Sequence, residues 1–250
     1  MVQAPLIPAN WTSFPDEFRN RLGTTVGRQR SMDAEGHLLI VAHLVPEHDE
    51  VSRRGVLFWR ESGGEWKCSN GDPGRVALSM HMDRYSQRLD AFEHQEVAAL
   101  NADDYLPLLE GLAPIVRSSR NLLEALEEAR KAVPDVRELI DHRDRAYDLA
   151  RQAELLYEDS KNSMDVAIVR RADEQAQSAH KMMVATHRLN ILAALFFPFA
   201  TLGAIFGTTL TDNWSWSQSP DSFILFVVIS LLGGMVLTLF VTQGTKAKDR

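Results

Sequence analysis

The stretch LFFPFATLGAIFGTTL (residues 195–210) decides the fold, because it is apolar almost throughout and ends on Gly207, Thr208 and Thr209. It lies inside a run of 23 residues without a charged side chain, 189–211, and a second run of 24 covers 222–245. About 20 such residues cross a hydrocarbon core of roughly 30 Å as a helix. Each run therefore predicts a transmembrane helix, and two adjacent runs of this length make a pair of buried core helices the weaker interpretation.

The remainder of the chain is acidic. Residues 189–250 hold three basic and three acidic side chains, so the formal net charge of −7 falls on residues 1–188. A nucleic-acid-binding protein would present a basic face, and that class is therefore disfavoured. An acidic domain beside a membrane can instead collect cations. Cys68 is the only cysteine, which suits a reducing compartment.

The charges that flank the two runs predict the topology. Lys181 and Arg188 precede the first run, a basic tail follows the second, and the connecting loop TDNWSWSQSPDS has two aspartates and no lysine or arginine. The positive-inside rule places both termini in the cytoplasm and the loop outside. We expect a two-span protein of the inner or plasma membrane.

The soluble part predicts a small sheet followed by helices. We expect a short helix at about 15–22, strands at 37–45, 55–60, 65–69 and 74–82, and helices at about 83–100 and 103–132, the latter open to kinking or splitting at Pro107 and Pro114. After Pro134, taken as a first-turn residue, one helix of roughly 110 Å would continue to residue 209 at 1.5 Å per residue. The predicted regions are a small α/β sheet region (1–85), a helical region with a stalk helix (86–188), a pore-lining transmembrane helix (189–210), an external loop (211–221), a second transmembrane helix (222–245) and a cytoplasmic basic tail (246–250). The predicted class is thus an α+β cytosolic domain whose very long stalk helix leads into two transmembrane helices.

A seam of apolar and small residues follows the predicted stalk at a spacing of 4-3-4-3-4. Its members are Leu149, Ala153, Leu156, Ser160, Ser163 and Ala167. Such a seam is typical of a coiled coil or of helices that line a narrow passage. An ordinary amphipathic helix packed on its neighbours explains it equally well.

Two spans cannot enclose a pore, so a conduction path would need symmetric assembly with one helix per subunit at the centre. The first run is the better lining helix, because it holds several threonines and the small-xxx-small pair Gly203 and Gly207, while Pro198 removes one backbone hydrogen bond.

The stretch HRLNILAALFFPFATLGAIFGTTL, with its short aromatic loop, second span and basic tail, resembles the CorA magnesium transporter family. That family ends a very long helix in a first span of the type x-F-x-P-L-T-x-x-A-G-I-Y-G-M-N. Phe196, Pro198, Ile205, Phe206 and Gly207 fall in register, and Thr208-Thr209 replaces Met-Asn. The resemblance covers about 175–250 and extends more weakly over 135–175.

The resemblance implies a homopentamer in the lipid bilayer that moves Mg²⁺ or another divalent cation. The ion filter would lie at Gly207-Thr208-Thr209, where threonine hydroxyls replace the usual amide. Hydrophobic constrictions would fall at Leu189 and Phe197. Ala200 stands where a threonine is usual, and Met183 where an asparagine is usual, so this pore would be more apolar than the family norm. Pro198 and Gly203 would shape helix packing.

Other residue types indicate little chemistry. No histidine has zinc-site spacing with cysteine or carboxylate partners, although His37 and His43 would share one face of a strand. Asp144, Asp148 and Asp173 are candidates for a regulatory cation site at subunit boundaries, as the resemblance implies. The sequence has no glycine-rich phosphate loop and no nucleophile–base set, so we expect neither an enzyme nor an organic cofactor.

Three hypotheses follow. The first is a CorA-like homopentameric channel or transporter for metal cations. The second is a non-conducting CorA-like sensor or scaffold that is anchored in the membrane and has lost the ion filter. The third is a two-span membrane protein of unrelated fold.

Overall fold

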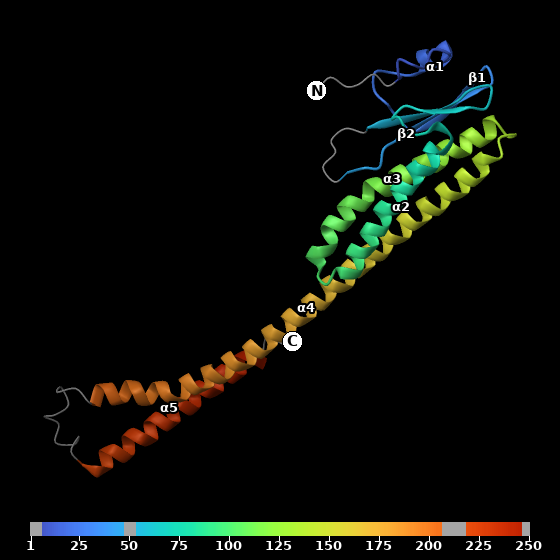
Figure 1. Cartoon of the computed structure of the whole chain (residues 1–250). Helices are drawn as coiled ribbons and strands as arrows, with labels where there is room; N and C mark the ends of the chain where they lie inside the picture. Colours follow the sequence, from blue (N-terminus) through green and yellow to red (C-terminus); the bar gives the residue numbers. More distant parts are fainter. Residues whose placement is uncertain (1–6, 48–53, 207–218, 247–250) are drawn as a thin grey trace. The chain divides into compact units, whose positions relative to one another are not determined.

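The computed structural model describes residues 7–47, 54–206 and 219–246 (Figure 1). The helices are α1 (Asp16–Arg21), α2 (Gly74–Ala98), α3 (Ala102–Ala132), α4 (Glu138–Phe206) and α5 (Pro220–Lys246). The strands are β1 (Arg30–Ala34), β2 (His37–His43), β3 (Gly55–Arg60) and β4 (Trp66–Cys68). Contacts divide the chain into two units, Met1–Arg170 and Arg171–Arg250, and α4 contributes to both.

The first unit is built on an antiparallel sheet of order β1-β2-β3-β4. Successive side chains of a strand point to opposite faces, and in β2 both faces are buried. Leu38 and Ile40 pack on the face covered by α2 and α3, whereas Leu39 and Val41 pack on the face covered by α1 and the segment before it (Figure 1). Because β2 is buried on both faces, it appears in the sequence as a continuous apolar run.

Most of the predicted strands are confirmed, one is wrong, and one strand was missed. The predicted strands at 37–45, 55–60 and 65–69 correspond to β2, β3 and β4. β1 was not predicted, because its sequence RSMDA is short and only Met32 and Ala34 are buried. The segment 74–82 is not a strand but the first part of α2.

The periodicity of buried residues explains why 74–82 is helical. In α2 the buried side chains are Ala77, Leu78, His81, Met82, Tyr85, Leu89 and Phe92. Their spacing of three to four residues places them on one helix face. The buried side chains run from Ala77 to Phe92 within a helix of 25 residues. The nine-residue window 74–82, with Val76 and four further apolar residues, resembles a strand when it is taken alone.

The helix α3 is a single element from Ala102 to Ala132, so Pro107 and Pro114 do not split it. Its start is fixed by Asp104, whose carboxylate accepts hydrogen bonds from the backbone amides of Leu100 (3.0 Å) and Asn101 (2.9 Å). These amides lower the pKa of Asp104, as expected where a carboxylate caps a helix.

The helix α4 begins at Glu138, so the prediction that Pro134 lies in its first turn is wrong. Pro134 lies in a turn that joins α3 to α4. The start of α4 is held to the sheet by the Trp66 indole, which donates to the Glu138 carboxylate at 2.6 Å. Farther along, Arg145 donates to Ser79 Oγ (2.8 Å) and forms an ion pair with Asp83, both on α2.

The 4-3-4-3-4 seam of α4 is buried within the first unit over its N-terminal part. Leu149, Ala153 and Ser160 are at most 5% exposed, and Leu149 and Ala153 belong to the core formed with α2 and α3. The Ser160 hydroxyl donates to the Leu156 carbonyl of its own helix at 2.7 Å. The structure therefore supports the ordinary amphipathic helix for this part of the seam, because its small side chains let α4 approach helices of the same chain.

Candidate functional site

Two described helices are long and apolar enough to cross a membrane, by length and composition alone. They are α4 in its C-terminal part and α5. None of the residues in the most apolar window of α4 is buried inside the chain, and 17% of those in the corresponding window of α5 are. These side chains therefore lack the cover that the core helices of a folded soluble domain have.

The two apolar helices pack on each other within the second unit through a face of small residues on α5. Gly233 and Gly234 meet α4 at Pro198 and Leu195. A Cβ added at Gly234 would lie 2.9 Å from the Leu195 carbonyl oxygen, whereas one added at Gly233 would lie 3.6 Å from the Pro198 ring. A ring pair between Phe199 on α4 and Phe226 on α5, with centroids 6.5 Å apart, extends the contact. The backbone of Gly234 thus lies close to that of Leu195, as small residues permit between membrane helices.

The opposite face of α4 is free of α5 and carries a second regular stripe. Its described members are Leu189, Ala193, Phe196, Ala200 and Gly203, again at 4-3-4-3 spacing, and all are exposed. A Cβ added at Gly203 would meet nothing within 4 Å. We call this set the free stripe. Its small members leave room for a second helix or a narrow passage.

The predicted pore residues fall on or beside the free stripe. Leu189 (64% exposed) and Ala200 belong to it, and Phe197 (67% exposed) is its direct neighbour. Met183 is also exposed, one turn and a half before Leu189 on the same helix. The predicted filter Gly207-Thr208-Thr209 lies outside the described residues.

The predicted packing residues are divided between two faces. Pro198 contacts Gly233 on α5, whereas Gly203 points away from α5. A further close contact between the two helices involves Gly234, which sequence reasoning did not single out as a packing residue. The adjacent pair Gly233-Gly234 in an otherwise bulky apolar run was the available signal.

The hydroxyls next to these faces are bonded within their own helices. Thr201 Oγ1 donates to the Phe197 carbonyl and Thr238 Oγ1 to the Gly234 carbonyl, both at 2.8 Å. Threonines satisfied in this way are tolerated in apolar surroundings. The Thr201 hydroxyl proton is therefore engaged, while its oxygen keeps its acceptor lone pairs.

The predicted regulatory acids do not form a cluster within one chain. Asp144 forms an ion pair with Arg143, and Asp173 accepts a hydrogen bond from Gln177 at 2.9 Å. Asp148 is exposed on the same helix. Among the described residues no group of three histidine, cysteine or acidic side chains is placed to hold a metal ion.

The histidines of β2 have structural partners. His43 is buried and its Nε2 lies 2.7 Å from the Gly27 carbonyl. His37 Nδ1 accepts a hydrogen bond from the Ser62 amide (3.2 Å), and its ring stacks on Trp59. The shared strand face therefore serves packing and turn formation.

Among the solved structures that match, a full-length one is similar over nearly the whole chain. It is described as the structure of the full-length CmaX protein, and it matches with a TM-score of 0.50 and 14% sequence identity. The match covers 96% of this chain and 83% of that one. At this identity the likeness shows a shared fold alone. No protein-family model and no curated protein matches the sequence.

Proposed function

We propose that this chain is one subunit of a homopentameric, CorA-like channel or transporter for metal cations in the inner or plasma membrane. The free stripe of α4 carries the proposal, because it is apolar, regular and turned away from the chain's own second span. A helix face of this kind needs lipid or further copies of the same helix to cover it. In the proposed assembly the stripes of five subunits surround the pore.

We infer the transported ion from the resemblance to the CorA family and from the charge of the chain. Mg²⁺ gives up its water reluctantly, so hydroxyls or amides that bind its hydration shell can select it. Five copies of Thr208 and Thr209 would supply such oxygens at the outer mouth. The acidic first 188 residues would concentrate divalent cations at the cytoplasmic side, where both termini are expected.

The second candidate is a non-conducting sensor or scaffold with the same anchor. One specific observation favours it: Met183, Leu189, Phe197 and Ala200 carry no hydroxyl, amide or charge. A pore lined in this way offers a hydrated ion little compensation for lost water, and narrow apolar constrictions close by dewetting.

Ion flux distinguishes the two candidates. The full-length protein is reconstituted in liposomes, and uptake of Mg²⁺, Zn²⁺, Co²⁺ and monovalent cations is compared with that of protein-free vesicles. Saturable divalent uptake supports the transporter. If the parent protein is silent and Thr209→Asn restores Mg²⁺ uptake, the parent is the non-conducting form.

The assembly is tested separately by mass. The protein in mild detergent is expected to have a mass near five chains once bound detergent is subtracted. A monomer would argue against both CorA-like candidates and in favour of an unrelated two-span protein.

A further inference from the structure

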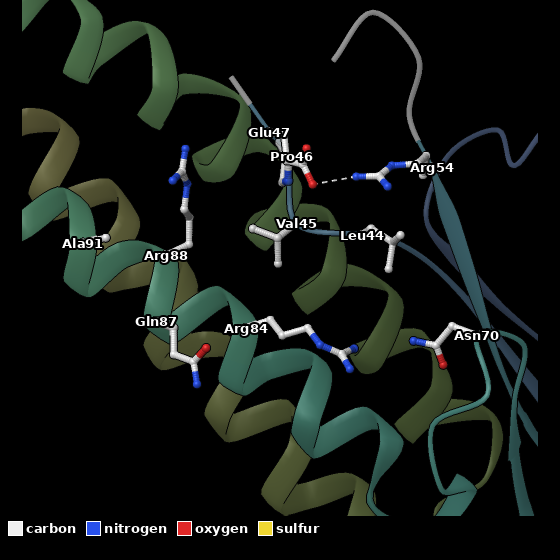
Figure 2. Close-up of a pocket in the computed structure, with 10 residues that line it drawn as sticks. All are labelled: Leu44, Val45, Pro46, Glu47, Arg54, Asn70, Arg84, Gln87, Arg88 and Ala91. Atoms are coloured by element: carbon white, nitrogen blue, oxygen red, sulfur yellow. Dashed lines mark hydrogen bonds and ion pairs between the residues drawn. The ribbon is translucent and has the colours of Figure 1, made fainter. Parts of the chain in front are cut away.

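A hollow in the first unit brings arginines together in a chain that is otherwise acidic. It has a volume of about 600 Å³ and lies between α2 and the segment that follows β2 (Figure 2). Its cationic side chains are Arg54, Arg84 and Arg88, and Glu47 is the single acid among its lining residues. A volume of this size suits a small organic molecule. The excess of guanidinium groups indicates an anionic one.

The three arginines differ in how firmly they are engaged. Arg84 is bonded to Asp72 at 2.8 and 2.9 Å, and this contact lowers the pKa of the Asp72 carboxyl and raises that of Arg84. Arg84 is therefore a fixed part of the wall. Arg54 pairs with Glu47 at 2.8 Å, but both side chains are more than half exposed. An exposed pair of this kind contributes at most about 1 kcal/mol, so loss of the Glu47 contact costs little.

Arg88 is the least satisfied of the three. Its Nε is buried and has no hydrogen-bond partner among the described residues. Its guanidinium lies 4.6 Å from the centroid of the Phe92 ring, which holds the group in place by a cation–π contact. Figure 2 shows Arg84 and Arg88 one turn apart on α2, on the side of the helix that faces residues 44–47. Arg88 is thus an oriented cation for which the described residues supply no carboxylate partner.

The other walls of the hollow have a different character. Leu44, Val45 and Ala91 line it beside the arginines, and Gln87 adds an amide. An apolar wall next to guanidinium groups matches a ligand that has an apolar or planar body and a charged head. The guanidinium fork binds phosphate oxygens in pairs, and a phosphate monoester carries a charge of about −1.5 to −2 near neutral pH.

We propose that this hollow is a binding site for a small phosphate-bearing metabolite. Arg88 and Arg54 hold the phosphate, Arg84 forms the fixed wall, and the body of the ligand lies against Leu44 and Val45. The site is independent of the proposed ion pathway, because every residue in it belongs to the first unit.

Binding of three probes to the full-length protein in detergent tests the proposal by calorimetry in metal-free buffer. Inorganic pyrophosphate represents the head group alone, AMP a head group with a body, and citrate a carboxylate competitor. We expect AMP to bind at least tenfold more tightly than citrate, and Arg88→Gln to weaken AMP at least tenfold. The matched control is Arg75→Gln, since Arg75 is exposed on the same helix and does not line the hollow; it should leave AMP binding unchanged.

A second variant covers the case in which Arg88→Gln fails to fold. Arg54→Gln removes a cation that is more than half exposed, so it should melt close to the parent protein and still weaken AMP severalfold. Tighter binding of citrate than of AMP would overturn the phosphate assignment. The site itself would be refuted by the absence of saturable binding of any probe, or by equal weakening in the Arg75→Gln control.

Discussion

Gly74 provides the sharpest test of how the first unit is packed. A Cβ added at this position would lie 1.7 Å from the Trp66 carbonyl oxygen and 2.3 Å from its carbon, against 3.4–4 Å for ordinary contact. The obstacle is backbone, so it cannot turn aside as a flexible side chain would. Gly74→Ala therefore requires the first turn of α2 to move away from β4.

The loss of folding free energy in Gly74→Ala follows from that displacement. Overpacking commonly costs about 1–3 kcal/mol and exceeds this range where backbone must shift. A loss of about 3 kcal/mol lowers the folding equilibrium constant more than a hundredfold. It should lower the melting temperature of a unit of this size by roughly 6–12 °C. The matched control is Gly63→Ala, because a Cβ at Gly63 would meet nothing within 4 Å and its φ is not positive.

The measurement is urea unfolding of the full-length protein in mild detergent, followed by tryptophan fluorescence. Trp11 and Trp59 are buried in the sheet core and report on the first unit. We expect the midpoint of Gly74→Ala to fall well below that of the parent, and the midpoint of Gly63→Ala to stay within error. If Gly74→Ala unfolds within about 0.5 kcal/mol of the parent, the close approach of α2 to β4 is wrong.

Three further predictions concern other parts of the chain. Burial lowers the pKa of His81 from 6.5 to about 4, so the unfolded chain binds a proton at a higher pH than the folded chain does. The free energy of unfolding should therefore fall as the pH drops from 6.5 towards 4. Across this range the urea midpoints of His81→Leu should vary less than those of the parent protein. Gly234→Ala should weaken the pairing of α4 with α5 by about 1–3 kcal/mol relative to Gly233→Ala. The reason is that only the Cβ added at Gly234 would meet a backbone atom at less than 3.0 Å. The two variants are compared by unfolding in a denaturing detergent, and equal midpoints would contradict the prediction. If the free stripe lines a pore, Phe197→Ala should raise the flux of divalent cations into liposomes severalfold. The control is Phe223→Ala, because Phe223 lies on α5 and is as exposed as Phe197, and this variant should leave the flux unchanged. The same change of flux in both variants would count against the pore assignment.

The elements predicted best from the sequence are those in which one kind of residue continues without interruption. The strands β2 and β3 are continuous apolar runs bounded by turn residues, and α4 is a long run of helix-forming residues without an internal breaker before Pro198. In both cases the local signal and the tertiary environment favour the same structure. The start of α2 was mistaken because its signal is spread along a helix of 25 residues.

The contacts between distant segments could not be predicted from the sequence. Nothing local shows that Arg88 lies beside residues 44–47, or that Gly234 rather than Gly203 meets the neighbouring helix. A glycine in a helix indicates a possible close approach, and only the partner backbone shows which glycine makes it. The sequence likewise placed the 4-3-4-3-4 seam correctly on one helix face without showing that the chain's own helices cover its N-terminal part.

The sheet has a consequence for how copies of this chain can meet. Exposed edge strands invite pairing with a strand of another molecule. Here the edge strand β4 is three residues long, and at the other edge the Ser31 amide of β1 already donates to the Glu128 carboxylate of α3 at 3.3 Å. Such short, partly capped edges are poor templates for strand addition. Self-association of this chain is therefore expected to proceed through helix faces, and aggregation by strand exchange to be slow even when the membrane helices are held in detergent.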